Sequence, residues 1–160
     1  MKVVIIAVLL MLSAICSATE TAFSSCNRIR LKKLADDGNK SAKKAMNICD
    51  NFDKALTAIL VGNNVVNISS SSIATVLFTE KFGKGSVGLA TVVMTVLVLI
   101  FGEILPKSLA KENSERFSIL MAAPLSAFMF ITYAYNGYLY GHKKRRFKAC
   151  GQQEQRAVCY

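Results

Sequence analysis

Long apolar runs alternate with short charged segments along this chain of 160 residues. Residues 3–25, 55–79 and 87–107 each approach or exceed the roughly 20 predominantly apolar residues that a helix needs to cross a bilayer. Charged residues flank each run. The pattern therefore predicts three membrane-spanning helices.

Residues 27–53, between the first two apolar runs, show a helical pattern over shorter segments. Apolar residues recur there at helical spacing among Lys and Arg, and the run Asp36-Asp37-Gly38-Asn39 interrupts them. We expect two amphipathic juxtamembrane helices that lie along the membrane surface. A soluble hairpin is the alternative, because the apolar face is narrow.

Residues 114–140 form a fourth long stretch, but it contains Pro124, Asn136 and Gly137. If this stretch crossed the membrane, the basic cluster 142–146 would lie on the outside, against the usual bias of positive charge toward the cytoplasm. We therefore expect 114–140 to be interfacial or re-entrant and broken near Pro124.

The domain organisation follows from these segments. Residues 1–140 are expected to form one membrane domain, and residues 141–160, where apolar periodicity is lost, a disordered or truncated tail. A composition that is 52% hydrophobic agrees with a small all-α membrane protein embedded in the lipid bilayer.

Charge gives the orientation of the chain in the membrane. Only Lys2 precedes the first run, whereas the segment 28–44 is strongly basic. We therefore expect a multi-pass protein of the plasma membrane with its N-terminus outside and with 28–44 and the C-terminus in the cytoplasm. The net charge of +10 does not indicate nucleic-acid binding, because the basic residues flank apolar runs and are not interleaved with aromatics.

Two features of the chain leave alternatives open. The first run also resembles a secretory signal, with Cys16-Ser17-Ala18 as a small-residue cleavage site, although the basic run after it is typical of a stop-transfer arrangement. The five cysteines are odd in number and form no CxxC pair, so neither a disulfide framework nor a zinc site is indicated.

Polar side chains interrupt the second apolar run at 62–72, where the sequence reads GNNVVNISSSS. Amides and hydroxyls are costly in hydrocarbon unless they find partners. On a helix, Asn63, Asn67, Ser70 and Ser71 share one face, because residues three or four apart align. Their oxygens can converge on a cation inside the membrane.

The first run carries a similar stripe, comprising Ser13, Ser17, Glu20 or Thr21, and Ser24. Small hydroxyl residues often only let helices pack closely, and for Ser13 and Ser24 this reading stands beside ion coordination. For Ser17 coordination is favoured. Glu20 lies near the end of the run, where it can pair with a base or orient the site.

The third run ends in GEILPK at 102–107, and its Glu103 stands within apolar surroundings, where a carboxylate is expected to be functional. Pro106 has no N–H for the carbonyl of Gly102. That carbonyl and the Glu103 carboxylate become neighbouring oxygen donors. A packing kink with a salt-bridged Glu is the alternative.

Carboxylate, amide, hydroxyl and carbonyl oxygens together form a set of hard ligands. Such a set suits Mg²⁺, Ca²⁺ or Na⁺ better than Zn²⁺ or Cu⁺. Because no nucleophile, base and orienting group converge in the sequence, we expect no enzymatic activity.

Three stretches in register also resemble the signature sequences of the cyclin M/CorC magnesium transporter family: SAICSATETA at 13–22, GNNVVN at 62–67 and GEILPK at 102–107. The resemblance covers about residues 3–140. It implies a homodimeric, three-helix membrane domain with a belt of juxtamembrane helices, which exports Mg²⁺ in exchange for Na⁺.

The resemblance also implies which residues surround the cation. They are Ser17, Asn63, Asn67, Ser71 with Ser70 as its alternative, Gly102 and Glu103. Five neighbours in the same stretches are expected to shape or gate the site: Glu20, Thr21, Asn64, Pro106 and Lys107.

Residues 141–160 do not resemble the start of the nucleotide-binding CBS modules with which full-length members of the family continue. We therefore expect no nucleotide regulation in this chain. Two functional alternatives remain: a membrane anchor or regulatory assembly protein without transport, and a non-functional truncated fragment.

Overall fold

A computed structural model describes residues 1–131, which contain helices and no strand and so confirm the all-α prediction. Contacts divide the chain into a unit Met1–Ser126 and a unit beginning at Ala127, and the packing described below belongs to the first unit. The elements are α1 (Lys2–Ser25), α2 (Arg28–Asp36), α3 (Lys40–Asp50), α4 (Phe52–Phe82), the 3₁₀ turn η1 (Lys84–Ser86), α5 (Val87–Leu97), the π-helical η2 (Val98–Ile104), α6 (Leu105–Glu112) and the helix Ser114–Ile131.

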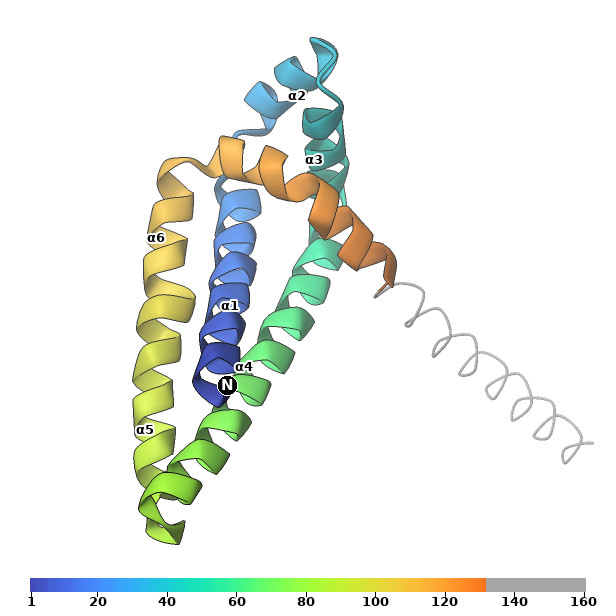
Figure 1. Cartoon of the computed structure of the whole chain (residues 1–160). Coiled ribbons are helices and arrows are strands. Elements are labelled where there is room, and N and C mark those ends of the chain that lie inside the picture. Colours follow the sequence, from blue (N-terminus) through green and yellow to red (C-terminus); the bar gives the residue numbers. More distant parts are fainter. Residues whose placement is uncertain (132–160) are drawn as a thin grey trace, which may run out of the picture. The chain divides into compact units, whose positions relative to one another are not determined.

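Helix α1 lies between α4 on one side and the continuous α5–η2–α6 rod on the other (Figure 1). Lys2 pairs with Glu80 and Ser13 with Asn63, so α1 and α4 run antiparallel. Glu20 pairs with Lys107, and Ser13 lies against Gly102, so α1 runs parallel to η2 and α6. This arrangement gives α1 neighbours on two flanks.

Small residues form the buried contacts of this unit. Most of its buried hydrophobic residues are alanines, and several serines are buried with them. Ala18 and Ala22 of α1 pack against Ala110 of α6, with Phe117 beside them. Such residues let helix backbones approach closely, which is the usual packing of membrane helices.

Large apolar side chains, in contrast, point outward from these helices. Val8 and Met11 of α1, Val65 and Ile68 of α4, and Val92 of α5 are each more than half exposed. Exposed apolar surface on this scale is unusual in a soluble monomer and marks an interaction surface. Together with the apolar helices, it indicates faces that contact lipid.

Three described helices are long and apolar enough to cross a membrane: Lys2–Ser25, Lys84–Glu112 and Ser114–Ile131. The first and second match the expected spans 3–25 and 87–107. The expected span 55–79 lies within α4, which has ample length at 31 residues but is not among the apolar candidates in the described chain. Its amides and serines lower its hydropathy.

The expectation that the fourth stretch breaks near Pro124 is wrong for the described part of it. The helix Ser114–Ile131 continues through Pro124. Proline removes one hydrogen bond from a helix, and neighbouring groups or local adjustment can compensate for that loss in membrane helices. The remainder of the stretch, 132–140, and the tail 141–160 lie outside the described residues.

The structure confirms two helices within residues 27–53, with α2 and α3 separated by Asp37, Gly38 and Asn39. Each begins at an asparagine cap. The Asn27 side chain accepts hydrogen bonds from the backbone N–H of Ile29 and Arg30, and Asn39 caps α3 in the same way. Such caps satisfy amide groups that a helix start leaves without partners.

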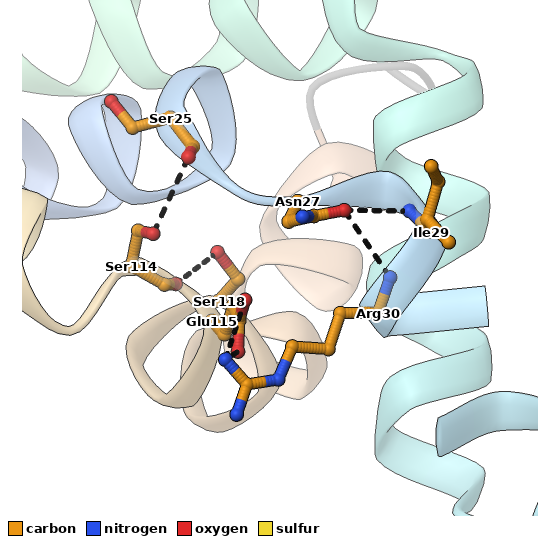
Figure 2. A network of polar contacts seen from close by, with 7 residues as sticks. All are labelled: Ser25, Asn27, Ile29, Arg30, Ser114, Glu115 and Ser118. Atoms are coloured by element: carbon orange, nitrogen blue, oxygen red, sulfur yellow. Dashed lines mark hydrogen bonds and ion pairs between the residues drawn. The ribbon is translucent and has the colours of Figure 1, made fainter. Parts of the chain in front are cut away.

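A polar network connects this region to the helix after α6 (Figure 2). The Ser114 hydroxyl donates to the carbonyl of Ser25 over 3.4 Å, at the end of α1. Arg30 of α2 forms an ion pair with Glu115, with 3.1 Å between Nη1 and Oε2. The contacts hold the ends of three helices together.

Candidate cation site between α1, α4 and η2

Ser13 lies at the centre of the contact between α1, α4 and η2. Its hydroxyl, fully buried, donates to Oδ1 of Asn63 over 2.8 Å. On the other flank, a Cβ placed on Gly102 would lie 3.0 Å from the Ser13 Oγ. Glycine at 102 therefore lets the η2 backbone approach α1 at the level where Ser13 reaches α4.

The backbone beside Gly102 departs from a regular α-helix. Residues Val98–Ile104 form a π-helix, in which the N–H of Leu105 bonds the carbonyl of Ile100, five residues earlier. Pro106, near the start of α6, has no N–H to offer the carbonyl of Gly102 or of Phe101. π-helical turns are frequent at functional sites, because they shift carbonyls and side chains out of the regular pattern.

Three buried oxygens in α1 and α4 have no hydrogen-bond partner among the described residues: Ser17 Oγ, Asn67 Oδ1 and Ser70 Oγ. All three belong to residues expected around the cation. Leaving such a group buried without a partner costs about 1–3 kcal/mol. These atoms are therefore candidates for a ligand that supplies the missing interaction.

Other hydroxyls in these helices satisfy themselves locally. Ser72, Thr75 and Thr79 of α4 each donate to the carbonyl four residues earlier, and Thr91 and Thr95 of α5 do the same. Such bonds are the ordinary solution for a hydroxyl in a helix. The unpartnered oxygens thus differ from these hydroxyls, and serine and threonine content alone does not explain them.

Helical rise estimates how the oxygens are spread along the bundle. With 1.5 Å per residue, Ser17 lies about 6 Å from the level of Ser13 toward α6, and Asn67 about 6 Å from the level of Asn63 in the opposite direction. Ser70 lies about 10 Å from the Asn63 level. One ion cannot contact both Ser17 and Ser70.

A groove of about 440 Å³ opens beside these residues between α4 and α5–η2. Its polar lining includes Asn67, Ser71, Thr75 and Thr95. Ser71 faces this groove, whereas Ser70 is buried. The two adjacent serines therefore have different surroundings, and Asn67 connects the buried oxygens with the groove.

Acidic residues flank the centre. Glu103, partly exposed, follows Gly102 directly and takes part in none of the ion pairs within residues 1–131. Glu20 lies 3.5 Å from Lys107 Nζ and forms the salt bridge that sequence reasoning considered for it. Thr21 is partly buried beside it on α1, and Asn64 is exposed on α4.

Ser13 is the residue at this centre that the predicted ligand set omits. Its position one turn before Ser17 is visible in the sequence, but so is the equally good explanation that a small residue lets helices pack. Only the contacts with Asn63 and Gly102 show that Ser13 lies where α1 meets both α4 and η2. In the described chain, no three His, Cys, Asp or Glu side chains gather as a metal site.

The helices, their outward apolar faces and the buried polar centre define an all-α, multi-pass membrane protein. Residues 4–156 match the family described as the cyclin M transmembrane N-terminal domain. The chain belongs to this family, which confirms the resemblance carried by its three signature stretches.

Relatives in bacteria and plants share much of the chain. A UPF0053 protein of Haemophilus influenzae is 40% identical over 130 residues, which cover 81% of this chain and 31% of the relative. A UPF0053 inner membrane protein of Escherichia coli is 37% identical, covering 74% and 28%. A chloroplastic DUF21 domain-containing protein of Arabidopsis thaliana is 35% identical, covering 81% and 20%. The chain thus spans less than a third of the length of these relatives.

Proposed function

We propose that this chain is the membrane domain of a divalent-cation transporter and that it carries Mg²⁺ through the contact between α1, α4 and η2. The observation that carries the proposal is the set of buried, unpartnered oxygens on α1 and α4. Cations at successive positions along the contact would give these oxygens the interaction that the protein does not. The family of the chain is consistent with this class of function.

In this proposal, neutral oxygens replace part of the water around the ion and one carboxylate supplies charge. Ser17, Asn63 and the Gly102 carbonyl would be the ligands nearest the centre, with the Glu103 carboxylate beside them. Asn67 and Ser71 continue the path into the groove. Mg²⁺ dehydrates reluctantly, so a path with several successive oxygens, some reached through water, fits its chemistry.

Direction and coupling follow from the family resemblance and are part of the proposal. Mg²⁺ would leave the cell in exchange for Na⁺ across the plasma membrane, with the N-terminus outside and α2, α3 and the C-terminus in the cytoplasm. The basic residues of 28–44 support this orientation. Opening to either side would require α1 to move against α4 or α6.

A homodimer is also proposed. Ser72 and Asn64 are exposed on α4, and the groove beside Ser71 is open. Polar groups at membrane depth normally face protein or a water-filled cavity, because lipid cannot hydrogen-bond to them. A second copy packed along α4 would supply the missing cover.

Transport is tested with the full chain reconstituted in vesicles loaded with Mg²⁺ and a Mg²⁺-sensitive dye. The wild type is expected to release Mg²⁺ down its gradient, and Glu103→Gln to abolish release while folding normally. Glu112→Gln is the matched control, because it makes the same chemical change at an exposed position of α6. Equal release by wild type and Glu103→Gln would reject the role of Glu103.

A membrane anchor or assembly protein is the second candidate. The direct hydrogen bond from Ser13 to Asn63 favours it, since this bond shows that polar groups between α1 and α4 can serve helix packing alone. In that case Asn63→Ala and Ser71→Ala should weaken self-association, and no cation should change the thermal stability.

A further inference from the structure

Two cysteines that are distant in sequence meet outside the cation site. Cys26 follows α1 directly, and Cys49 lies in the last turn of α3. Their sulfur atoms are 3.4 Å apart. Because a disulfide bond is about 2.05 Å long, the sulfurs need to approach by only about 1.4 Å to become bonded.

The two thiols have different surroundings. Cys49 is 2% exposed, whereas Cys26 is partly exposed. Arg28 donates from Nη2 to the carbonyl of Cys49 over 2.9 Å, which brings a guanidinium charge to the pair and holds α2 against the end of α3. A small oxidant can reach Cys26 but not Cys49.

The pKa values of the two thiols also differ, and the more exposed Cys26 is the more acidic. The hydrogen bond from the Cys49 thiol lowers the pKa of Cys26 to about 7 against the opposing effect of burial, with help from Arg28 and the Ser118 hydroxyl. The pKa of Cys49 is raised, because its proton is held by the Cys26 sulfur and because it is buried. Cys26 is therefore the nucleophile and Cys49 the thiol that follows.

We propose that Cys26 and Cys49 form a reversible oxidation site, at which a hydroperoxide converts the two thiols to a disulfide that a dithiol reductant reopens. In the first step the Cys26 thiolate attacks one peroxide oxygen and the O–O bond breaks, which forms a sulfenic acid at Cys26. The departing hydroxide takes up the proton that the Cys26 thiol released and leaves as water. Cys49 then attacks that sulfur, and its proton leaves with the hydroxyl as a second water. Overall, two thiols and one H₂O₂ give one disulfide and two waters.

The bond would connect two parts of the bundle. It closes between residues 23 positions apart and joins the end of α1 to the end of α3, immediately before α4 begins at Phe52. Since α1 and α4 carry Ser13 and Asn63, the oxidised form restrains the two helices whose separation would open the contact. Cys26 directly follows Ser25, whose carbonyl accepts from Ser114 in the network of Figure 2.

The test uses the full purified chain, reduced and then treated with H₂O₂. Peptide mapping of the wild type should find a Cys26–Cys49 disulfide with the loss of two hydrogen atoms in mass, and dithiothreitol should restore both thiols. A disulfide that connects other cysteines, or no disulfide at all, would overturn the proposal. This arm needs no variant and so does not depend on a mutant's folding.

Single variants test the order of the two steps in a background with Cys16, Cys150 and Cys159 replaced by Ser. Cys49→Ser should accumulate a sulfenic acid at Cys26, trapped by dimedone, whereas Cys26→Ser should leave Cys49 unlabelled. Equal labelling of both variants would contradict the assigned roles.

The pH dependence of the first step follows from the pKa of Cys26. At about 7, the thiolate fraction rises from roughly a tenth at pH 6 to roughly nine tenths at pH 8, so the oxidation rate should rise about tenfold. A rate that rises only above pH 8 would show an ordinary thiol and contradict the role of Cys49 in activating Cys26.

Discussion

A hydroxyl buried between helices can bond to its own backbone or to a group on another helix, and this chain uses both solutions. Thr19 and Ser118 donate to carbonyls one turn earlier, whereas Ser13 donates across to Asn63. Ser17 and Ser70 do neither within the described residues. The cost of an unsatisfied group makes these exceptions informative at the scale of single atoms.

Gly102→Ala tests the close approach of η2 to α1. The added Cβ would meet Ser13 Oγ at 3.0 Å, and the hydrogen bond to Asn63 opposes a shift of that hydroxyl. We expect a loss of about 1–3 kcal/mol in stability. Because the chain has no tryptophan, thermal unfolding followed by circular dichroism is the suitable measurement.

Gly88→Ala is the matched control for this substitution. A Cβ at Gly88, on α5, would meet nothing within 4 Å. Alanine there should stabilise the helix by up to about 1 kcal/mol. If Gly102→Ala were as stable as Gly88→Ala, the proposed close contact at Ser13 would not be important for packing.

Among the elements, the rod α5–η2–α6 is the least regular. Its π-helical segment precedes Pro106, and α6 begins without a break in the helix. An extra residue in the turn changes which side chains face α1, so Glu103 and Gly102 need not follow α-helical spacing from α5. This irregularity gives one helix both a close-packing glycine and a neighbouring carboxylate.

Pro106→Ala tests whether this irregularity serves the cation. Alanine restores an N–H and favours a regular helix, so the ion-free protein should become more stable, by up to about 3 kcal/mol. The carbonyl near Gly102 would then have a backbone partner, and the thermal shift on adding Mg²⁺ should fall. An unchanged Mg²⁺ shift would mean that the freed carbonyl does not bind the ion.

For the molecule as a whole, the distribution of polar and apolar residues is inverted relative to a soluble protein. Alanines and serines are inside, and Val65, Ile68 and Val92 are outside. Lipid satisfies the apolar faces, but it cannot satisfy the open groove lined by Ser71 and Asn67. We therefore expect a partner to cover α4.

We expect that cover to be a second copy of the chain. Native mass spectrometry from detergent should give twice the 17.4 kDa mass of the chain. Replacing Ser72, exposed on α4, by Phe should reduce the dimer, whereas the same change at exposed Ser108 of α6 should not. A monomer at all protein concentrations would leave the groove to another occupant and contradict the homodimer.

The hydrophobic pattern predicted most of the helices, because it depends on local sequence. Asn39 and the break before it located the turn between α2 and α3. Pro124 misled the same reasoning, because the effect of a proline depends on neighbours that compensate for its missing hydrogen bond. The π-helix at Val98–Ile104 likewise has no simple sequence signal.

Site residues were only partly accessible from sequence for a similar reason. Helical spacing brought Asn63 and Asn67 to one face, but it could not show that Ser13 donates to Asn63. The meeting of Cys26 and Cys49 depends on how α3 packs back toward α1, which no motif reports. Contacts between elements, unlike the elements, require the fold.

Thermal stability of the purified chain tests most directly whether the oxygens between α1, α4 and η2 bind a cation. Mg²⁺ should raise the unfolding midpoint of the wild type, since binding to the folded state stabilises it by mass action. The thermal shifts measured with Ca²⁺, Mn²⁺ and Na⁺ show which cation the site prefers. Glu103→Gln and Ser17→Ala should each reduce the Mg²⁺ shift, and exposed Glu112→Gln should keep it. A wild type whose midpoint responds to none of these cations, or equal shifts in wild type and Glu103→Gln, would contradict cation binding by these oxygens and Glu103.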